Sequence, residues 1–442
     1  MDDLSAASEG FSAGISTADA ADFRRSVSIS VHPWFDPDDR RVNLRTLTQA
    51  SSAERGTSAA VRRGDRHLVI THYFTDGPAQ ELVAYLRRRG DHVTLISHPF
   101  PYCDDTRSWM ETPATGGDVT IRRFMRWGGP GFGFYIKDVI LTVFWGMRSD
   151  APFGLVVACD PLNAFAAILL RALGRAKRVV FYSIDYADRR FPCSILNRIY
   201  HSLDLFACRF SDRVWALSKR MTDRRAERFR GHRLAPTDTV PTGGDFEHIP
   251  RQPDDRSDPI RLAYLGHVRK FQGLELALEV VANLKNEFPA LRLVVLGHGP
   301  ILDDLKARAT ALGIDAHVDF RGYIESHAEA ERILSQQGIG LALYEPDPES
   351  FTYYADPNKP QIYMACGLPV LITDVPASAQ DIARANAGQL VEYSVDSVAR
   401  ALRLWLTDHN AYLAARHNAI ALAQDRSWTR VFDKAMAPFR SP

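Results

Sequence analysis

The chain has 442 residues and a formal net charge of +1, with 45% hydrophobic and 24% charged residues. This length favours two or three domains over one and allows a large core without disulfides or structural metals. The near-neutral charge argues against a nucleic-acid partner. The five cysteines are scattered and form no CxxC pair, which argues against structural zinc and for a reducing compartment.

The start of the chain differs from the rest. The first residues are acidic and polar and resemble no signal peptide, and no uninterrupted apolar stretch is long enough to span a bilayer. We therefore expect a cytoplasmic protein. Residues 1–65 are rich in Ser, Ala, Asp and Arg without a sustained hydrophobic period, which predicts a disordered extension with a short strand at Val27–Val31 as a candidate element.

A first α/β series begins at His67. The pattern predicts a strand at His67–Thr71, a helix at Ala79–Arg89 and a second strand at His92–Ser97. Asp76 and Gly77 lie in the loop before the helix, where an acceptor molecule could approach the backbone. The loop lacks the GxGxxG pattern of dinucleotide sites, so the series indicates a doubly wound domain without that fingerprint.

Polar residues follow three strands of this first series. His72 ends the first strand, Asp160 follows Leu155–Cys159, and Asp185 follows Arg178–Ser183. Ligands of open parallel sheets bind beyond the carboxyl ends of the strands. An aspartate at such a place can also be a helix cap. The three residues together predict a cleft.

The segment Phe132–Met147 is a predicted helix with many aromatic residues. Arg122, Arg123, Arg126 and Lys137 lie on it or just before it. Such a helix can lie on an anionic membrane surface. It can also pack against the core and leave a basic edge in solvent. Both interpretations stay open, so peripheral membrane contact is one of the predicted alternatives.

A second α/β series follows a linker at residues 246–258, which are rich in Pro, Asp and Arg. Strands and helices alternate strictly over residues 259–425, which implies a parallel sheet with right-handed crossovers. Residues 426–442 form a predicted last helix that can pack back on the first domain. The predicted strands of the second series are Ile260–Leu265, Leu291–Leu296, Val318–Arg321, Ile339–Leu343, Val370–Thr373 and Gln389–Glu392.

Cations occupy two loops at the carboxyl ends of these strands. Arg269 and Lys270 lie in the loop Gly266–Gly273, just before a predicted helix, and Lys359 stands at the start of the helix Pro360–Cys366. Cations and helix N-termini together suit a diphosphate. The stretch around Lys359, taken alone, equally fits an ordinary crossover with a surface lysine.

Two further loops supply glycines and an aromatic residue. Gly297 and Gly299 flank His298, and glycines there would let a sugar or a flat group approach the backbone. Gly322 and Tyr323 follow the third strand, where backbone groups and an aromatic face could meet a base.

These loops carry a family resemblance. The second domain resembles the donor-binding half of GT-B glycosyltransferases of the family 4 type, whose fold is two Rossmann-like, doubly wound α/β domains facing each other across a cleft. The resemblance covers about residues 67–440 and is only organisational in the first domain. Its motifs are Leu265-Gly266…Gly273, Leu296–Pro300, Phe320–Tyr323, Leu343–Glu345 and Lys359–Val370, with Pro241–Asp245 closing the first domain.

The resemblance implies a function and roles for the residues. It implies a UDP- or GDP-sugar donor, no obligatory metal, and retaining transfer to an acceptor hydroxyl in glycan, polysaccharide or glycolipid synthesis. The acceptor, a glycan, a lipid-linked sugar or a small molecule, would bind in the domain of residues 66–245. The resemblance implies that the catalytic residues are His72, Asp160 and Asp185, and that the donor diphosphate is bound by Gly266, Arg269, Lys270 and Lys359. It implies that the nucleoside is contacted by Gly297, Gly299, Tyr323, Glu345 and Glu349, and the acceptor by Asp76 and Gly77.

The sequence departs from the family pattern in the second domain. Ile362 stands where the family usually carries a glutamate that holds the ribose hydroxyls, and Glu345 or Glu349 could take over that contact. His267 and Gln272 stand where the family usually has its two basic residues, so the positive charge of that loop has moved to the residues between them.

The departures keep two alternative functions open. In the first domain, the histidine that the family often has near Cys159 and Asp160 is not found in the neighbouring sequence. A sugar-nucleotide epimerase of GT-B type would need a compact set of carboxylates and a histidine, which the sequence does not assemble. An inert GT-B scaffold that binds a partner would explain Ile362, but the retained cations argue against it.

Overall fold

The computed structural model describes most of the chain after residue 64. The expectations for residues 1–64, for Asp76 and for Glu349 lie outside the described residues. The described ranges are residues 65–73, 77–100, 103, 105–113, 119–124, 131–191, 193–347 and 351–440.

The first domain is built on an eight-stranded sheet in the order β4-β3-β2-β1-β5-β6-β7-β8. Only the pairs β2–β3 and β3–β4 are antiparallel, and the rest of the sheet is parallel. Its strands are β1 (Arg66–Tyr73), β2 (His92–Pro99), β3 (Ser108–Pro113), β4 (Val119–Phe124), β5 (Phe153–Cys159), β6 (Ala176–Ser183), β7 (Arg213–Ala216) and β8 (Thr237–Thr239). The strand β3 was missed in the sequence, because its Glu and Pro residues are atypical of strands.

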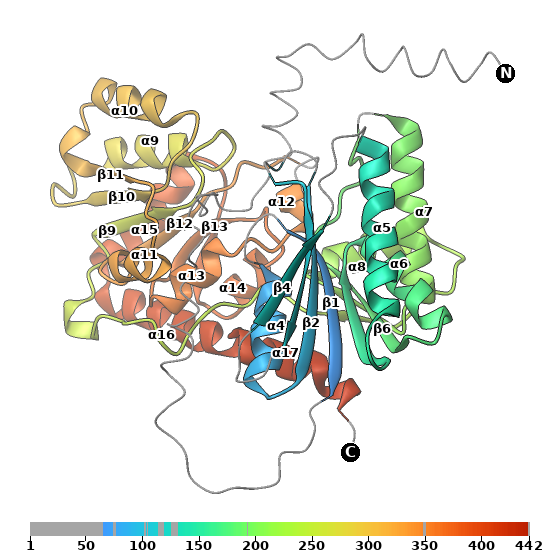
Figure 1. Ribbon diagram of the computed structural model, residues 1–442. Helices are drawn as coiled ribbons and strands as arrows, with labels where there is room; N and C mark the ends of the chain where they lie inside the picture. The colour runs from blue at the N-terminus through green and yellow to red at the C-terminus, as the bar shows by residue number, and fades with distance from the viewer. Residues whose placement is uncertain are drawn as a thin grey trace, which may run out of the picture.

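Helices cover both faces of this sheet. The helices α5, α6 and α7 stand side by side along one face (Figure 1). Buried side chains of β1, such as Leu68 and Ile70, pack toward this layer, and Val69 packs toward the other. The helices are α4 (Pro78–Arg88), α5 (Gly131–Met147), α6 (Pro161–Ala172), α7 (Ser194–Phe210) and α8 (Lys219–Arg228).

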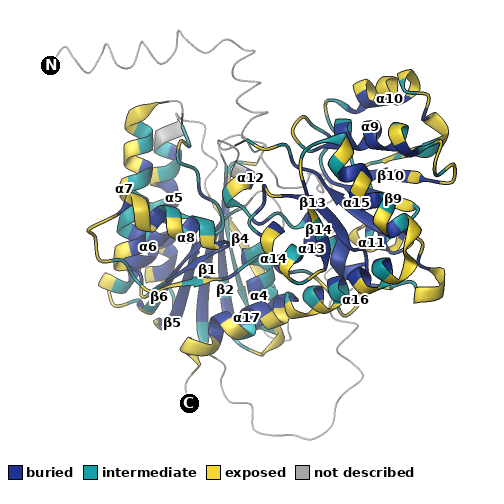
Figure 2. Ribbon diagram, turned by 180° about the vertical axis from the view of Figure 1, so that it is seen from behind, coloured by how far each residue is buried: buried dark blue, intermediate teal, exposed yellow. Residues whose placement is uncertain are grey.

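The second domain has a parallel six-stranded sheet in the order β11-β10-β9-β12-β13-β14. Figure 2 shows that the strands are mostly buried, as expected of a sheet covered on both faces. Its strands are β9 (Arg261–Leu265), β10 (Arg292–Leu296), β11 (Val318–Gly322), β12 (Ile339–Ala342), β13 (Val370–Thr373) and β14 (Gly388–Val391).

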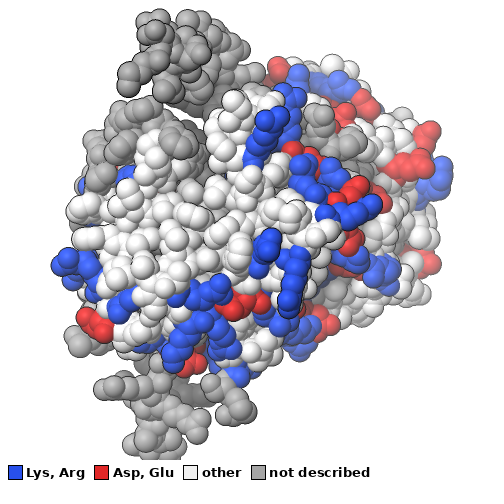
Figure 3. All heavy atoms as spheres, turned by 90° about the vertical axis from the view of Figure 1, so that its right-hand side faces the viewer, with Lys and Arg blue, Asp and Glu red and all other residues white. Residues whose placement is uncertain are grey.

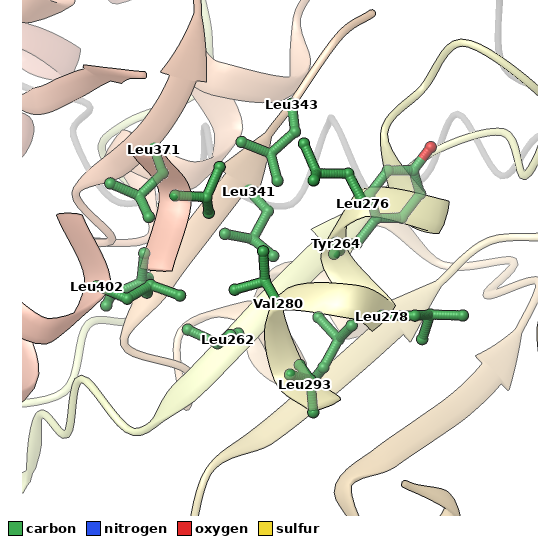
Figure 4. Packing of buried hydrophobic residues seen from close by; sticks show 14 of the residues in the cluster. Leu262, Tyr264, Leu276, Leu278, Val280, Leu293, Leu341, Leu343, Leu371 and Leu402 are labelled. Atoms are coloured by element: carbon green, nitrogen blue, oxygen red, sulfur yellow. The ribbon is translucent and has the colours of Figure 1, made fainter. Parts of the chain in front are cut away.

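The helices of the second domain enclose an aliphatic core. Leu262, Leu293, Leu341 and Leu371 from the sheet meet Val280 and Leu402 from the helices (Figure 4). The helices are α9 (Leu274–Leu284), α10 (Leu302–Ala311), α11 (His327–Leu334), α12 (Phe351–Tyr354), α13 (Lys359–Ala365), α14 (Ala379–Arg384), α15 (Val395–Thr407), α16 (His409–Asp425) and α17 (Trp428–Met436).

The last helix returns to the first domain. The helices α16 and α17 run along one side of both domains (Figure 1), and α17 packs against α4. Tyr85 of α4 donates a hydrogen bond to Asp433 Oδ1 at 2.6 Å. Trp428 and Phe432 are buried with side chains of the first domain.

Both sheets reverse their strand order once. In the first sheet the reversal lies between β1 and β5, and in the second it lies between β9 and β12. A topological switch point of this kind opens a crevice beyond the carboxyl ends of the two strands. The predicted fold class, two doubly wound α/β domains, is confirmed. The two switch points are where a site is expected.

Candidate active site

His72 and Asp160 meet at the switch point of the first sheet. His72 lies near the end of β1, and Asp160 follows β5 directly. The ring nitrogen Nδ1 of His72 lies 2.6 Å from Asp160 Oδ2, although the residues are 88 positions apart in the chain. A histidine therefore lies beside Asp160, although it comes from another strand of the sheet.

The backbone of Asp160 is strained. Its φ of 104° and ψ of 160° lie in a region that glycine adopts easily and other residues avoid, at a cost of about 1–3 kcal/mol. The side chain is held firmly, because Oδ1 accepts from the backbone N–H groups of Leu162 and Asn163 at 2.9 Å each. Asp160 therefore caps α6 and also faces His72, and its catalytic role stays a prediction.

A second carboxylate, Asp138 of α5, reaches His72 from the other side. Its Oδ2 lies 3.4 Å from His72 Nε2, and its Oδ1 lies 3.2 Å from Nδ1 of His98. Lys137 Nζ lies 3.1 Å from the same Oδ1. The sequence interpretation that placed Lys137 on a solvated edge is wrong, because Lys137 is 3% exposed and pairs with Asp138 inside the domain.

The two carboxylates set the charge of His72. Burial alone would lower the pKa of His72, but the nearby Asp160 and Asp138 outweigh burial and raise it to about 10. In turn, the two histidines hold the pKa of Asp138 well below its usual range in spite of burial, and burial lowers the pKa of His98. His72 is therefore an imidazolium at neutral pH. It can donate hydrogen bonds there and cannot act as a base.

Asp185 is paired with Arg190 rather than with His72 or Asp160. Its Oδ2 accepts from Arg190 Nη1 at 2.7 Å, and its side chain is 44% exposed. Burial lowers the pKa of the Arg190 guanidinium, but Asp185, Tyr200 and then Asp160 outweigh burial and raise it. The structure brings His72 and Asp160 together directly, whereas Asp185 pairs with Arg190, whose charge also lies within the influence of Asp160.

Gly77 stands at the start of α4. Its φ of −162° is an extended conformation that any residue adopts, and its N–H donates to Gln80 Oε1 at 3.1 Å. The predicted proximity of this loop to an acceptor remains a prediction, since Asp76 lies outside the described residues.

In the second domain, Lys359 is buried above the loop that follows β9. Its Nζ lies 4.1 Å from the ring centre of Tyr264 and 5.0 Å from that of Tyr344, and it donates to Gln272 Oε1 at 3.3 Å. Gly266 makes room for it: a Cβ there would lie 3.2 Å from Lys359 Cε, and the φ of 131° disfavours other residues. The interpretation of Lys359 as a surface lysine is wrong.

Lys359 has little to stabilise its charge. Burial, followed by the proximity of Arg269, lowers the pKa of Lys359 to about 7. No carboxylate among the described residues forms an ion pair with it. Burial also lowers the pKa of Arg269, whereas Lys270 is exposed. An anion bound here would stabilise both buried cations.

Gly297 and Gly299 serve the packing of two loops. A Cβ at Gly297 would lie 1.8 Å from the carbonyl oxygen of Gly266, and one at Gly299 would lie 2.1 Å from that of Val268. The loop after β10 therefore rests directly on the loop after β9. The sequence suggested that these glycines admit a ligand, and the structure adds a contact within the chain that requires them.

The remaining predicted nucleoside residues lie at the same edge of the sheet. Tyr323 is 36% exposed and follows β11, the edge strand beside β10. Glu345 follows β12, and its N–H donates to the carbonyl oxygen of Phe271 at 3.1 Å. Ile362 packs against the core of the domain, which leaves no polar group at that position.

Several buried polar atoms of the second domain have no hydrogen-bond partner among the described residues. Buried polar groups in folded proteins are nearly always hydrogen-bonded, so a cluster of exceptions indicates a ligand site. Most of them could not be found from the sequence, because nothing in a short motif shows that an amide is buried. The atoms are Tyr344 Oη, Asn358 Oδ1, both polar atoms of Gln361, His267 Nδ1 and Glu275 Oε2.

Asp356 lies between the two domains. Its Oδ2 accepts from the N–H of Thr242 at 3.1 Å, and its carbonyl oxygen accepts from Thr242 Oγ1 at 2.6 Å. Burial is the main cause of the raised pKa of Tyr182 in the first domain and of Tyr344 in the second. The charge of Asp356 raises both pKa values further. The carboxyl ends of the two sheets therefore converge on the same region.

The family of the chain follows from its second domain. Residues 245–422 match the family described as Glycosyl transferases group 1. The second domain is therefore a group 1 glycosyltransferase domain. No curated protein matches its sequence.

Solved structures show that this glycosyltransferase has the GT-B fold. A sucrose-phosphate synthase from Thermosynechococcus elongatus is similar with a TM-score of 0.62 at 15% identity, over 86% of this chain and 98% of that one. HepE from Anabaena, solved with UDP, gives 0.59 at 15% identity, over 84% and 99%. A glycosyltransferase from Rickettsia africae gives 0.63 at 13% identity, over 86% and 98%.

The family match covers one of the two groups of candidate site residues and leaves the other outside it. Lys359, Arg269 and the unpartnered polar atoms lie within the matched residues, whereas His72, Asp138 and Asp160 lie in the unmatched first domain. Among the described residues, no group of three or more His, Cys, Asp or Glu side chains is arranged to hold a metal ion. The described helices include none that is long and apolar enough to cross a membrane.

Proposed function

We propose that this glycosyltransferase transfers a sugar, with retention, from a UDP- or GDP-sugar to an acceptor hydroxyl bound near His72. The observation that carries the proposal is the buried Lys359, which has no described carboxylate partner and lies beside Tyr344, whose buried Oη has no described hydrogen-bond partner. A nucleoside diphosphate would supply the missing negative charge and hydrogen bonds. HepE, which has the same fold, was solved with UDP and with UDP and glucose, so UDP-sugars are the first donors to test.

The charges suit the breaking of the bond between the anomeric carbon and the diphosphate. Negative charge develops on the departing phosphate oxygen, and Lys359 and Arg269 would stabilise it. With retention in a single step, the acceptor oxygen approaches the face from which the diphosphate leaves. The departing oxygen is then the nearest acceptor for the hydroxyl proton.

His72 and Asp160 would position the acceptor. The imidazolium of His72 donates hydrogen bonds, and it would orient a hydroxyl or stabilise negative charge. Both oxygens of Asp160 accept hydrogen bonds within the chain, so its first role is to hold His72. Asp185 is more exposed and could contact a hydroxyl of the acceptor through its free lone pairs.

The ribose needs an acceptor group other than the side chain at Ile362. Glu275, at the start of α9, has a buried Oε2 without a partner among the described residues. Glu275 and Glu345 both influence Tyr393, because burial and then Glu345, Glu275 and Glu279 raise the pKa of Tyr393 to about 12. We assign ribose binding to this pair. Glu275→Gln should then reduce the preference for UDP over its 2′-deoxy analogue.

The proposal includes a setting for the reaction. We propose a cytoplasmic enzyme of glycan, polysaccharide or glycolipid synthesis that needs no divalent metal and contacts the membrane peripherally. Its acceptor is a glycan, a lipid-linked sugar or a small molecule. Activity that survives excess EDTA would support the metal-independent mechanism, and full loss of activity that Mg²⁺ or Mn²⁺ restores would contradict it.

The central experiment measures thermal melting and donor hydrolysis with a panel of UDP- and GDP-sugars. One nucleotide should raise the melting temperature by several degrees when it is present at about 100 times its Kd. The matching sugar nucleotide should be hydrolysed slowly without an acceptor. No response to any nucleoside diphosphate would favour the inert scaffold, and conversion of the donor to its epimer would favour the epimerase.

A further inference from the structure

One face of the first domain is exposed and apolar. It is formed by α5, α6 and α7 together with the edge strand β4, whose Phe124 packs against Trp145 of α5 with ring centres 6.4 Å apart. We call it the apolar face. Figure 3 shows this side of the molecule, with a broad area free of charged side chains and, below it, Lys and Arg gathered with a few Asp and Glu among them. Its exposed side chains include Ile136, Ile140, Phe144 and Met147 of α5 and Ile195 and Ile199 of α7.

The helix α5 carries large apolar residues on its exposed side as well as on its buried side, where Leu141 and Trp145 lie. Its charged residues Lys137 and Asp138 are buried at 3% and 1% exposure, whereas Ile140 is 60% exposed. Surface helices normally turn their apolar stripe to the core and their charges to water. A contiguous exposed stripe of large apolar residues therefore indicates a contact with something other than water.

The exposed charges of the apolar face have one sign. The carboxylates in α5, α6, α7 and β4 are Asp138 and Asp204, and both are buried. Asp204 is paired with Arg225 inside the domain. The exposed charged side chains on these four elements are basic and include Arg122, Arg123, Arg198 and Arg209.

We propose that the apolar face docks on an anionic membrane surface. Large apolar side chains that enter the interface, flanked by arginines that reach phosphate groups, are the features of a peripheral membrane contact. A second copy of the chain fits less well, because two such faces would bring arginines against arginines. The charge therefore selects an anionic bilayer over self-association.

The apolar face begins at the candidate active site. The ring of Tyr135, one residue before Ile136, lies 6.4 Å from the ring of His72, and Asp160 caps α6. Docking would bring the acceptor side of the cleft to the lipid headgroups, so an acceptor carried in the membrane could reach His72. This consequence rests on the proposed function, whereas the docking itself can be tested without it.

The test is co-sedimentation of the full chain with lipid vesicles. The protein should bind vesicles of equal parts phosphatidylglycerol and phosphatidylcholine, and bind pure phosphatidylcholine at least about tenfold more weakly. Ile140→Glu combined with Phe144→Glu should weaken binding by about tenfold or more. Arg198→Glu combined with Arg209→Glu should remove most of the preference for anionic lipid. Leu390→Glu with Leu404→Glu, a matched change at exposed positions of the second domain, should bind as the wild type does.

Two results would overturn the docking proposal. The first is no binding of the wild type to the anionic vesicles, or equal binding of the Ile140/Phe144 variant. The second is a dimer in light scattering that this variant dissociates, which would make the face a contact between copies. Melting with UDP and GDP separates the two proposals: a nucleotide response without vesicle binding removes only the docking, and vesicle binding without any nucleotide response removes only the proposed function.

Discussion

His72 in the first domain and Lys359 in the second are buried cations at the switch points of their sheets, but their surroundings differ. His72 lies 2.6 Å from Asp160 and 3.4 Å from Asp138, and its pKa rises to about 10. Lys359 faces two tyrosine rings, a glutamine amide and the nearby Arg269, and its pKa falls to about 7. The charge of His72 is satisfied within the protein. The charge of Lys359 has no such partner among the described residues, so we expect Lys359 to bind an anion.

The comparison predicts opposite effects of pH on stability. The pKa of His72 is raised above the ordinary 6.5, so its contribution to stability is full below about pH 6.5 and is lost as pH rises toward 10. The pKa of Lys359 is lowered from the ordinary 10.5, so it destabilises the fold below about pH 7 and this cost is relieved as pH rises toward 10.5. Over that range the two groups offset each other.

The largest expected effect comes from removing a partner of His72. Asp160→Asn keeps a helix cap but leaves the imidazolium with one carboxylate, and it should lower the free energy of unfolding by about 3 kcal/mol. The pKa of His72, followed by NMR, should fall at the same time. Asp303→Asn, at an exposed ion pair with Lys306, is the control and should change stability by less than about 0.5 kcal/mol. Equal effects of the two changes would contradict a special role for the pair.

The next effect concerns the donor. Lys359→Met keeps the apolar length of the side chain and removes its charge, so it should weaken UDP or GDP binding by about 2 kcal/mol, or roughly 30-fold. Its stability at neutral pH should be unchanged or higher, since an uncompensated buried charge is removed. Calorimetric titration gives the affinity. Lys219→Met, at an exposed position of α8, is the matched control. If the control lost as much affinity as the Lys359 variant, the assignment of Lys359 to the donor site would be refuted.

The two pKa values can be separated with the same kind of variants. Between about pH 7.5 and 9.5, His72→Gln should gain stability relative to the wild type by about 1.4 kcal/mol per pH unit. Lys359→Met should lose stability relative to the wild type by about the same slope. Urea denaturation at several pH values measures both slopes. Parallel curves for all three proteins would show that neither group titrates as the geometry indicates.

The smallest effect is the pH dependence of donor binding. A nucleotide sugar that binds the charged form of Lys359 should lose about tenfold in affinity between pH 6 and pH 8. A nucleotide sugar is a diphosphate diester and carries constant charge over this range, so it is a better probe here than free UDP or GDP. Lys359→Arg should bind with much less pH dependence, since arginine stays charged. A pH profile identical to the wild type in that variant would place the titrating group elsewhere.

Much of the fold follows from local patterns in the sequence. Runs such as Val370–Thr373 and the glycine breaks between elements predicted the strands and helices of the second domain, because a strand buried on both faces must be apolar throughout its length. The cationic loops also follow from the sequence, because the carboxyl ends of parallel strands lie at one edge. The strand β3 did not, because it pairs at an antiparallel extension without an apolar pattern.

What the sequence determined was therefore the two α/β series, the loops with Arg269 and Lys359, and the polar strand ends at His72 and Asp160. Only the tertiary structure decided that β1 lies beside β5, so that His72 meets Asp160, and that α5 turns Asp138 inward. It also decided that Lys359 is buried over Gly266. The physical reason is that periodicity records which face of an element is apolar, whereas the charge of a buried group depends on neighbours that come from distant parts of the chain.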